Sequence, residues 1–298
     1  MMGMALSSAV DEGGRSYRPA VVNDQISPAD FERLAGLVTS QTGIKLPPAK
    51  QLMIEGRLRK RMRARNQPNL NAYCRFLFDQ GGLESEITHL IDVVTTNKTD
   101  FFREPDHLDF METRMVDALL SQTRPRPLLK VWSAASSNGA EAWSIAMVLE
   151  DMARKRRNFS YAILGTDIST VVLEQARRAV YPAEAMEPVP TDKRQRYVME
   201  SRDPELRGEV RIVPELRQRA QFNRMNLMDT QYPYDRDVDI IFLRNVLIYF
   251  EKADQEAVVA RLVGHLRRGG YLVVGHSESM VVVESSVRQV GPTVFQKS

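Results

Sequence analysis

The chain contains little of what builds covalent cross-links or metal cages. Its 298 residues include one cysteine, Cys74, which excludes an internal disulfide and any metal site made of several cysteines. The four histidines are scattered, and none has the spacing of a metal-binding motif. We therefore expect no metal cofactor. The histidines are His89, His107, His265 and His276.

Long apolar runs and a strong net charge are also missing. No run approaches the ~20 apolar residues that a membrane-spanning helix needs, and no basic segment leads into an apolar one, as in a signal peptide. The net charge of +3 does not by itself indicate nucleic-acid binding. With 43% hydrophobic and 27% charged residues, we expect a globular cytoplasmic protein of two domains, without direct membrane insertion.

Residues 128–167 have the pattern of a strand, a loop, a helix and a second strand. Two apolar runs, Leu128–Trp132 and Tyr161–Gly165, flank a helical pattern, and Asp167 follows the second run. In such a unit a ligand can approach the backbone at the helix N-terminus, and an acidic residue can accept hydrogen bonds from ribose hydroxyls. The pattern predicts a nucleoside pocket, although a unit without a ligand would share it.

The number of glycines in the loop narrows the choice of nucleoside. A dinucleotide-binding loop has three glycines because a pyrophosphate must lie against the backbone, whereas this loop has only Gly139. A ligand without phosphates fits better. S-adenosylmethionine has a ribose and an adenine, and carries a methionine tail in place of phosphates.

The remaining patterns divide the chain into four parts. Residues 1–25 lack periodicity and are predicted to be a disordered tail, and helical patterns fill 26–94, beginning with Ser27 as N-cap. Residues 95–127 form a junction with a linker helix near 110–120 and a proline-rich connector at 123–127. Residues 128–298 are expected to form the catalytic domain.

One predicted helix, from Pro48 to Asn66, is strongly basic. Its apolar residues Ile54, Leu58 and Met62 form a narrow stripe, and six bases lie within nine residues. Like charges at this spacing repel one another, so we favour an acidic partner over a merely solvated surface. The six bases are Arg57, Arg59, Lys60, Arg61, Arg63 and Arg65.

The C-terminal half alternates strands and helices, which is typical of an α/β fold with a mostly parallel, doubly wound sheet. Its pocket is expected at the carboxyl ends of the strands. Val210–Val213 and Ala220–Phe222 alternate instead like short antiparallel strands. They predict a small antiparallel β-subdomain inserted at about 183–225.

Five segments, taken in order, resemble the CheR-type chemotaxis receptor methyltransferases over about residues 27–298. The resemblance implies a class I methyltransferase (Rossmann-like) fold and S-adenosylmethionine as methyl donor. It also implies methylation of receptor glutamates, with S-adenosylhomocysteine as product. The segments are Thr95 to Glu104, Trp132-Ser133-Ala134-Ala135-Ser136, Gly165-Thr166-Asp167-Ile168, Arg244-Asn245-Val246-Leu247-Ile248-Tyr249-Phe250 and Gly275-His276-Ser277-Glu278-Ser279.

The resemblance also implies residue roles. Arg103 and Tyr249 would lie near the transferred methyl. Thr99 could instead cap a helix, Asn245 could be a turn residue, and His276 is expected to hold a turn together rather than catalyse. The implied cofactor-binding residues are Asn97, Thr99, Arg103, Glu141, Asp167, Asn226, Leu227, Asn245 and Val246.

Expected partners follow from the same resemblance. Arg57, Arg59, Arg61 and Arg63 would bind the cytoplasmic helices of methyl-accepting chemotaxis receptors, and the β-subdomain could bind a receptor C-terminal peptide. We expect a monomer that is recruited to membrane receptor arrays and does not bind nucleic acid.

The loop after the first strand departs from the family, which usually has Ser-Thr-Gly-Glu-Glu-Pro-Tyr-Ser. Here it reads Ser137-Asn138-Gly139-Ala140-Glu141-Ala142-Trp143-Ser144. This departure leaves open a non-catalytic scaffold that binds S-adenosylmethionine as a signal. A methyltransferase for small molecules or nucleic acid is a further alternative, but the basic helix lacks aromatic residues on which bases could stack.

Overall fold

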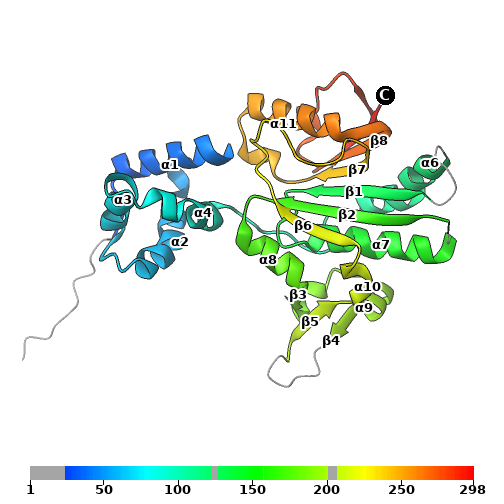
Figure 1. The fold of residues 1–298 in the computed structure, drawn as a ribbon, viewed down its shortest axis with the longest axis horizontal. Coiled ribbons are helices and arrows are strands. Elements are labelled where there is room, and N and C mark those ends of the chain that lie inside the picture. The colour runs from blue at the N-terminus through cyan, green and yellow to red at the C-terminus, as the bar shows by residue number, and fades with distance from the viewer. Residues whose placement is uncertain (1–23, 122–126, 157, 201–206) are drawn as a thin grey trace, which may run out of the picture.

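The computed structural model describes residues 24–121, 127–156, 158–200 and 207–298. Of the predicted tail only Asp24 and Gln25 fall in this part, and of the predicted connector only Pro127. A helical domain lies at one end of an α/β domain (Figure 1). Among the described residues, no helix is both long enough and apolar enough to cross a membrane.

The N-terminal domain consists of helices packed on one core. Ser27 begins the first helix as predicted, because its Oγ accepts a hydrogen bond from the Asp30 amide at 3.1 Å. Leu34, Ile54 and Leu58 are fully buried in the shared core. The helices are α1 (Pro28–Thr42), α2 (Gln51–Ala64), α3 (Leu70–Asp79) and α4 (Leu83–Val94), with a 3-10 turn at Pro48–Lys50 before α2.

An irregular segment follows α4 and leads into a continuous helical stretch. This stretch consists of α5 (Asp106–Phe110), a π-helical turn (Met111–Met115) and α6 (Val116–Ser121). The predicted linker helix is therefore confirmed, but it begins at Asp106, earlier than expected.

The α/β domain is built on a mostly parallel sheet, as predicted. The strand order is β6-β2-β1-β7-β8-β10-β9. The first five strands in this order run parallel to one another, and β10 and β9 are antiparallel to their neighbours. The strands are β1 (Leu128–Ala134), β2 (Ser160–Asp167), β6 (Ala220–Arg224), β7 (Val238–Leu243), β8 (Leu266–Val274), β9 (Val287–Gly291) and β10 (Val294–Lys297).

Helices cover both faces of this sheet (Figure 1). α7 (Ala140–Arg156) and α8 (Thr170–Arg178) lie on one face, and α11 (Lys252–His265) lies on the other. Val131 on β1 packs in the first core, whereas its neighbour Trp132 packs in the second. Because both faces are covered, the central strands are continuous apolar runs.

The inserted β-subdomain exists, but its predicted extent was wrong. It contains β3 (Val180–Pro182), β4 (Val198–Glu200) and β5 (Glu209–Ile212) in the antiparallel order β3-β5-β4, together with α9 (Thr191–Tyr197). Ala220–Phe222 belongs instead to β6, which pairs in parallel with β2 after the short helix α10 (Pro214–Arg217). An edge strand is buried on one face only, so β6 alternates in sequence like an antiparallel strand.

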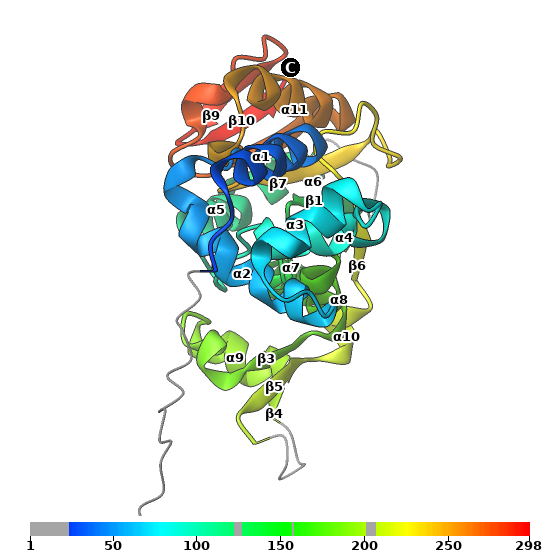
Figure 2. The ribbon, with the colours of Figure 1, turned by 90° about the vertical axis from the view of Figure 1, so that its left-hand side faces the viewer.

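The helical domain lies in front of the sheet in the view of Figure 2, and hydrogen bonds join the two domains. The Lys45 amide donates to the Tyr249 carbonyl at 3.0 Å. At the start of α8, the carboxylate of Asp92 accepts from the Thr170 amide at 2.7 Å and from its hydroxyl at 2.8 Å. The helical domain is thereby fixed over the predicted position of the pocket.

Candidate active site

A cavity lies between the helical domain and the carboxyl ends of β1, β2 and β7. Together with its open mouth it holds about 1210 Å³ of space, and pockets of roughly 300–1,000 Å³ commonly bind small molecules and cofactors. All the residues implied as cofactor-binding line it, and so does Tyr249. The helical domain contributes Thr42, Leu46, Lys50 and Met53 to the same wall.

The loop after β1 has an unusual backbone that brings it close to β2 and α8. Ala135, Ser137 and Gly139 have positive φ angles of 60°, 49° and 87°. A Cβ at Gly139 would lie 2.9 Å from the Cβ of Ala176 on α8. A larger residue at this position would therefore be strained and would also clash with α8.

Asp167 ends β2 at the centre of the cavity wall, with 8% of its surface exposed. Its two oxygens accept hydrogen bonds from the amides of Ser137 and Ser169, both at 2.9 Å. Burial raises the pKa of Asp167, and these amides oppose the shift. A carboxylate fixed in this way retains lone pairs that two ribose hydroxyls could use.

Arg244, directly after β7, connects several segments of the wall. Its side chain is 4% exposed and pairs with Glu141 and Glu104, each at 3.2 Å, and it donates to the Arg103 carbonyl. Burial raises the pKa of Glu141, although Arg244 acts against the shift. Arg244 therefore fixes the backbone of Arg103 and the carboxylate of Glu141.

Glu104 is held between Arg244 and Asn245. The Asn245 amide nitrogen donates to Glu104 Oε1 at 3.1 Å. Although burial acts in the other direction, the hydrogen bond from Asn245 and the charge of Arg244 lower the pKa of Glu104. The sequence analysis included Glu104 and Arg244 in motifs but assigned them no role, because their partners come from distant segments.

Glu278 fixes the loop that carries Asn245 and Tyr249. Its carboxylate accepts hydrogen bonds from the amides of Asn245 at 2.7 Å, Gly275 at 2.8 Å and Leu247 at 2.8 Å. Burial raises its pKa, and these amides act against the shift. The prediction that His276 holds this turn was wrong, because Glu278 makes these bonds and His276 is exposed.

The structure shows where Thr99, Asn245 and Asn226 lie. Asn245 has a φ of 58° and is a turn residue, but it lines the cavity as well. Thr99 lies in the irregular segment before α5 and caps no helix, since the N-cap of α5 is Pro105. Asn226 lines the cavity, but its amide already donates to the Gln41 carbonyl at 2.6 Å and accepts from the Met228 amide at 3.0 Å.

Two family models match the chain. Residues 97–295 match the S-adenosylmethionine binding domain of CheR methyltransferases, and residues 29–95 match the all-alpha domain of the same family. The chain belongs to the CheR methyltransferase family. It therefore carries the S-adenosylmethionine binding domain of a methyltransferase, and the cavity lies where the two matched regions meet.

Relatives of this CheR chain are similar over nearly its whole length. The chemotaxis protein methyltransferase of Salmonella typhimurium is 36% identical over 278 residues, which cover 92% of this chain and 91% of the relative. Chemotaxis protein methyltransferase 2 of Pseudomonas aeruginosa is 35% identical, covering 89% and 92%. The chemotaxis protein methyltransferase of Borreliella burgdorferi is 31% identical, covering 93% and 97%.

The residues at which the loop departs from the usual family motif lie outside the cavity wall. Ala140, Ala142 and Trp143 are buried in the core, where Trp143 packs on Phe222 with ring centroids 5.2 Å apart. Asn138 uses its carboxamide oxygen to accept from the Ala140 amide at 3.2 Å. Glu141, which keeps the family residue, does line the cavity of this CheR chain.

Proposed function

We propose that this CheR methyltransferase transfers the methyl group of S-adenosylmethionine to glutamate side chains of methyl-accepting chemotaxis receptors. The products are glutamate methyl esters and S-adenosylhomocysteine. The observation that carries the proposal is the convergence of every implied cofactor residue, with Arg103 and Tyr249, on one cavity. The relatives named as chemotaxis protein methyltransferases support the receptor as substrate.

The residues of the cavity suit this cofactor. Asp167 offers a fixed carboxylate to the ribose hydroxyls. Asn226 with Leu227, and Asn245 with Val246, would frame the adenine and methionine portions. When bound, S-adenosylmethionine supplies a methyl group made electrophilic by its sulfonium.

The chemistry requires positioning more than proton transfer. A glutamate has a reference pKa of about 4.3, so it reaches the site already ionised and needs no general base. Arg103 can orient the incoming carboxylate with two parallel hydrogen bonds, and Tyr249 lies on the same cavity wall. Exclusion of water and alignment of the reacting groups would supply much of the rate.

The basic helix α2 suits a partner with acidic side chains. It begins at the cavity, where Lys50 and Met53 line the wall. An acidic receptor helix lying along α2 could therefore present a glutamate to the site. We propose that such helices are the partner, and that the β-subdomain is the candidate site for a receptor C-terminal peptide.

The arginines of α2 differ in the contacts that they make with the rest of the helical domain. Arg57 donates to the carbonyls of Val94 and Thr95 at 3.1 and 2.8 Å, where it caps α4. Arg61 pairs with Glu86 at 2.6 Å. Both therefore have partners inside the domain. Arg59 is half-buried and donates to the Asp24 carbonyl at 2.8 Å, so it has one as well. We therefore assign direct receptor contact to Lys60 and Arg63, which are exposed.

The scaffold alternative is not favoured. It was suggested by the altered loop, but the altered side chains pack in the core or bond within the loop and leave the cavity wall intact. We propose that the protein acts as a cytoplasmic monomer at membrane receptor arrays.

Transfer of a labelled methyl group tests the proposed function. The protein is incubated with methyl-labelled S-adenosylmethionine and receptor-containing membranes, and the label is then treated with base. We expect label on the receptor that base releases, because it is held as an ester. Binding of S-adenosylhomocysteine without any transfer would favour the scaffold, and base-stable label would show another substrate group.

A further inference from the structure

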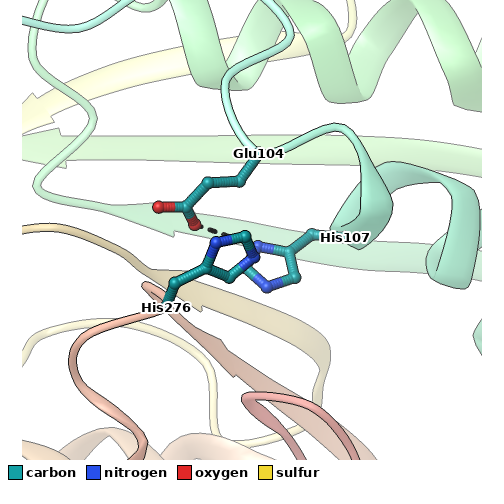
Figure 3. Close-up of side chains that lie close together, drawn as sticks. All are labelled: Glu104, His107 and His276. Carbon is teal, nitrogen blue, oxygen red and sulfur yellow. Dashed lines mark ion pairs between the residues drawn. The ribbon is translucent and has the colours of Figure 1, made fainter.

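Glu104 and two histidines, His107 and His276, lie close together (Figure 3). Glu104 precedes α5, His107 lies on α5, and His276 follows β8. One ligand atom from each residue can be chosen so that all three lie within 4.8 Å of one another. This group could not be predicted from the sequence because His276 is far along the chain from the other two residues.

We assign the hydrogen of the neutral His107 ring to Nε2. Nε2 lies 2.6 Å from the hydroxyl of Thr293, and that hydroxyl also lies 2.6 Å from the Pro292 carbonyl, to which it can donate. With its hydrogen directed at Pro292, the Thr293 oxygen accepts from Nε2. In this tautomer Nδ1 keeps a lone pair.

Nδ1 of His107 lies close to a carboxylate. His107 is 3% exposed, and among the described residues its buried Nδ1 has no hydrogen-bond partner. Glu104 Oε2 lies 3.4 Å from it. A lone pair and a carboxylate oxygen at this distance repel each other unless a proton or a metal cation lies between them.

We propose that Glu104, His107 and His276 bind a divalent transition-metal ion, with Zn²⁺ as the best fit. Imidazole and carboxylate ligands suit this class of ion. A metal-bound histidine typically donates its second ring N–H to an oxygen, and the Thr293 hydroxyl lies 2.6 Å from Nε2 of His107 for this purpose. His276 is exposed, so an ion can enter from solvent and keep water as a further ligand.

The surroundings also limit the affinity. Arg244 contacts the same oxygen of Glu104 at 3.2 Å, and its positive charge opposes a second cation. We therefore expect weaker binding than at a closed structural zinc site. Because Glu104 also bonds Asn245 at 3.1 Å, it belongs both to this group and to the supports of the cofactor cavity.

Cobalt titration tests the site in the full chain. Chelator-treated protein is titrated with Co²⁺ while visible absorption is recorded, and Zn²⁺ is then added as competitor. We expect one equivalent of Co²⁺ to give d–d bands that Zn²⁺ abolishes. His276→Ala should weaken binding by about tenfold or more, whereas His89→Ala, at an exposed histidine of α4, should leave it unchanged.

A second variant and a second measurement guard against misfolding. Glu104→Gln keeps the shape of the side chain but removes its charge, and it should also weaken Co²⁺ binding while the melting temperature shows that the chain is folded. Nitrogen NMR should show Zn²⁺ shifting Nδ1 of His107 but not of the His89 ring. Absence of d–d bands, binding unaffected by His276→Ala, or an Nδ1 that carries a proton at neutral pH would overturn the proposal.

Discussion

Asp167 shows how a single side chain can be prepared for a ligand. The positive φ of Ser137 turns its amide toward Oδ2, and the start of α8 places the Ser169 amide against Oδ1. The carboxylate cannot rotate without losing one of these bonds. Its orientation is therefore set by backbone geometry before any nucleoside arrives.

Replacing Asp167 by Asn should weaken S-adenosylhomocysteine binding by about 10- to 100-fold, because hydrogen bonds to a charged acceptor contribute about 1.5–3 kcal/mol. The new NH₂ group would also face one of the two backbone amides. Isothermal calorimetry measures the change. Asp192→Asn, at an exposed residue of α9, is the matched control, and equal affinities for the two variants would refute the role of Asp167.

The proposed mechanism uses no general base and therefore predicts a flat pH profile. With receptor and cofactor saturating, the methylation rate should hardly change between about pH 6.5 and 8.5, since the substrate carboxylate is ionised throughout. Burial raises the pKa of Asp167, so cofactor affinity should fall on acidification at a higher pH than for an ordinary aspartate. A steep titration of the rate near neutrality would implicate a base such as His276 and contradict this mechanism.

At the scale of elements, α2 has two distinct sides. Its inward arginines stabilise the helical domain, whereas Lys60 and Arg63 point outward and are exposed. The sequence showed the density of charge but could not separate these roles, because the partners of Arg57 and Arg61 lie on or just after α4.

Replacing Lys60 and Arg63 together by Ala should reduce receptor methylation about threefold to tenfold, as expected for two exposed charge pairs. The effect should grow at low salt, where exposed charges are less screened. Cofactor affinity should not change. Arg114→Ala with Lys155→Ala removes two exposed bases elsewhere, and a similar loss in that control would mean that α2 has no special role.

Glu86 is the buried partner of the arginines on the inward side of α2. It is 0% exposed and accepts hydrogen bonds from Arg61 at 2.6 Å, Arg65 at 2.5 Å and the Tyr73 hydroxyl at 2.7 Å. Although burial acts in the opposite direction, the bonds from Arg61, Tyr73 and Arg65 lower its pKa to about 2. The ionised carboxylate therefore stabilises the fold above its unfolded pKa, and this contribution is lost as the pH falls toward 2.

Glu86→Gln should lower the free energy of unfolding at pH 7 by about 3 kcal/mol, because it leaves the arginines without their buried partner. The difference from the unmodified chain should shrink as the pH falls from about 4.5. Urea denaturation measures both. Glu84→Gln, at an exposed neighbour on α4, should have little effect, and equal stability of the two variants would contradict the ion-pair assignment.

The strands show where sequence patterns succeed and fail. Central strands such as β7 are buried on both faces and are plain in the sequence. The residues of β6 were predicted to belong to the antiparallel subdomain, but β6 pairs in parallel with β2. An alternating sequence pattern indicates which face of a strand is buried, but it does not identify the neighbouring strand. Glu278 was missed because its three amide donors come from two separate loops.

At the scale of the whole molecule, the cavity depends on both domains. Lys45 pairs with Glu251 at 2.7 Å, and Asp92 caps α8, so the helical domain is fixed where it completes the wall. The motifs predicted which residues would line the cavity. Asp167 and Asn245 lie at or just after strands whose carboxyl ends share one edge of the sheet, and the segment after α4 adds Arg103. The meeting of Glu104, His107 and His276 could not be predicted, since it depends on how α5 packs beside the end of β8.

We propose that the two domains enclose S-adenosylmethionine with its sulfonium directed at an incoming glutamate. A crystal structure of the protein with S-adenosylhomocysteine tests this binding mode. We expect both ribose hydroxyls within hydrogen-bond distance of Asp167, and the sulfur facing the space between Arg103 and Tyr249. A cavity filled by its own side chains, or a nucleoside bound elsewhere, would refute it.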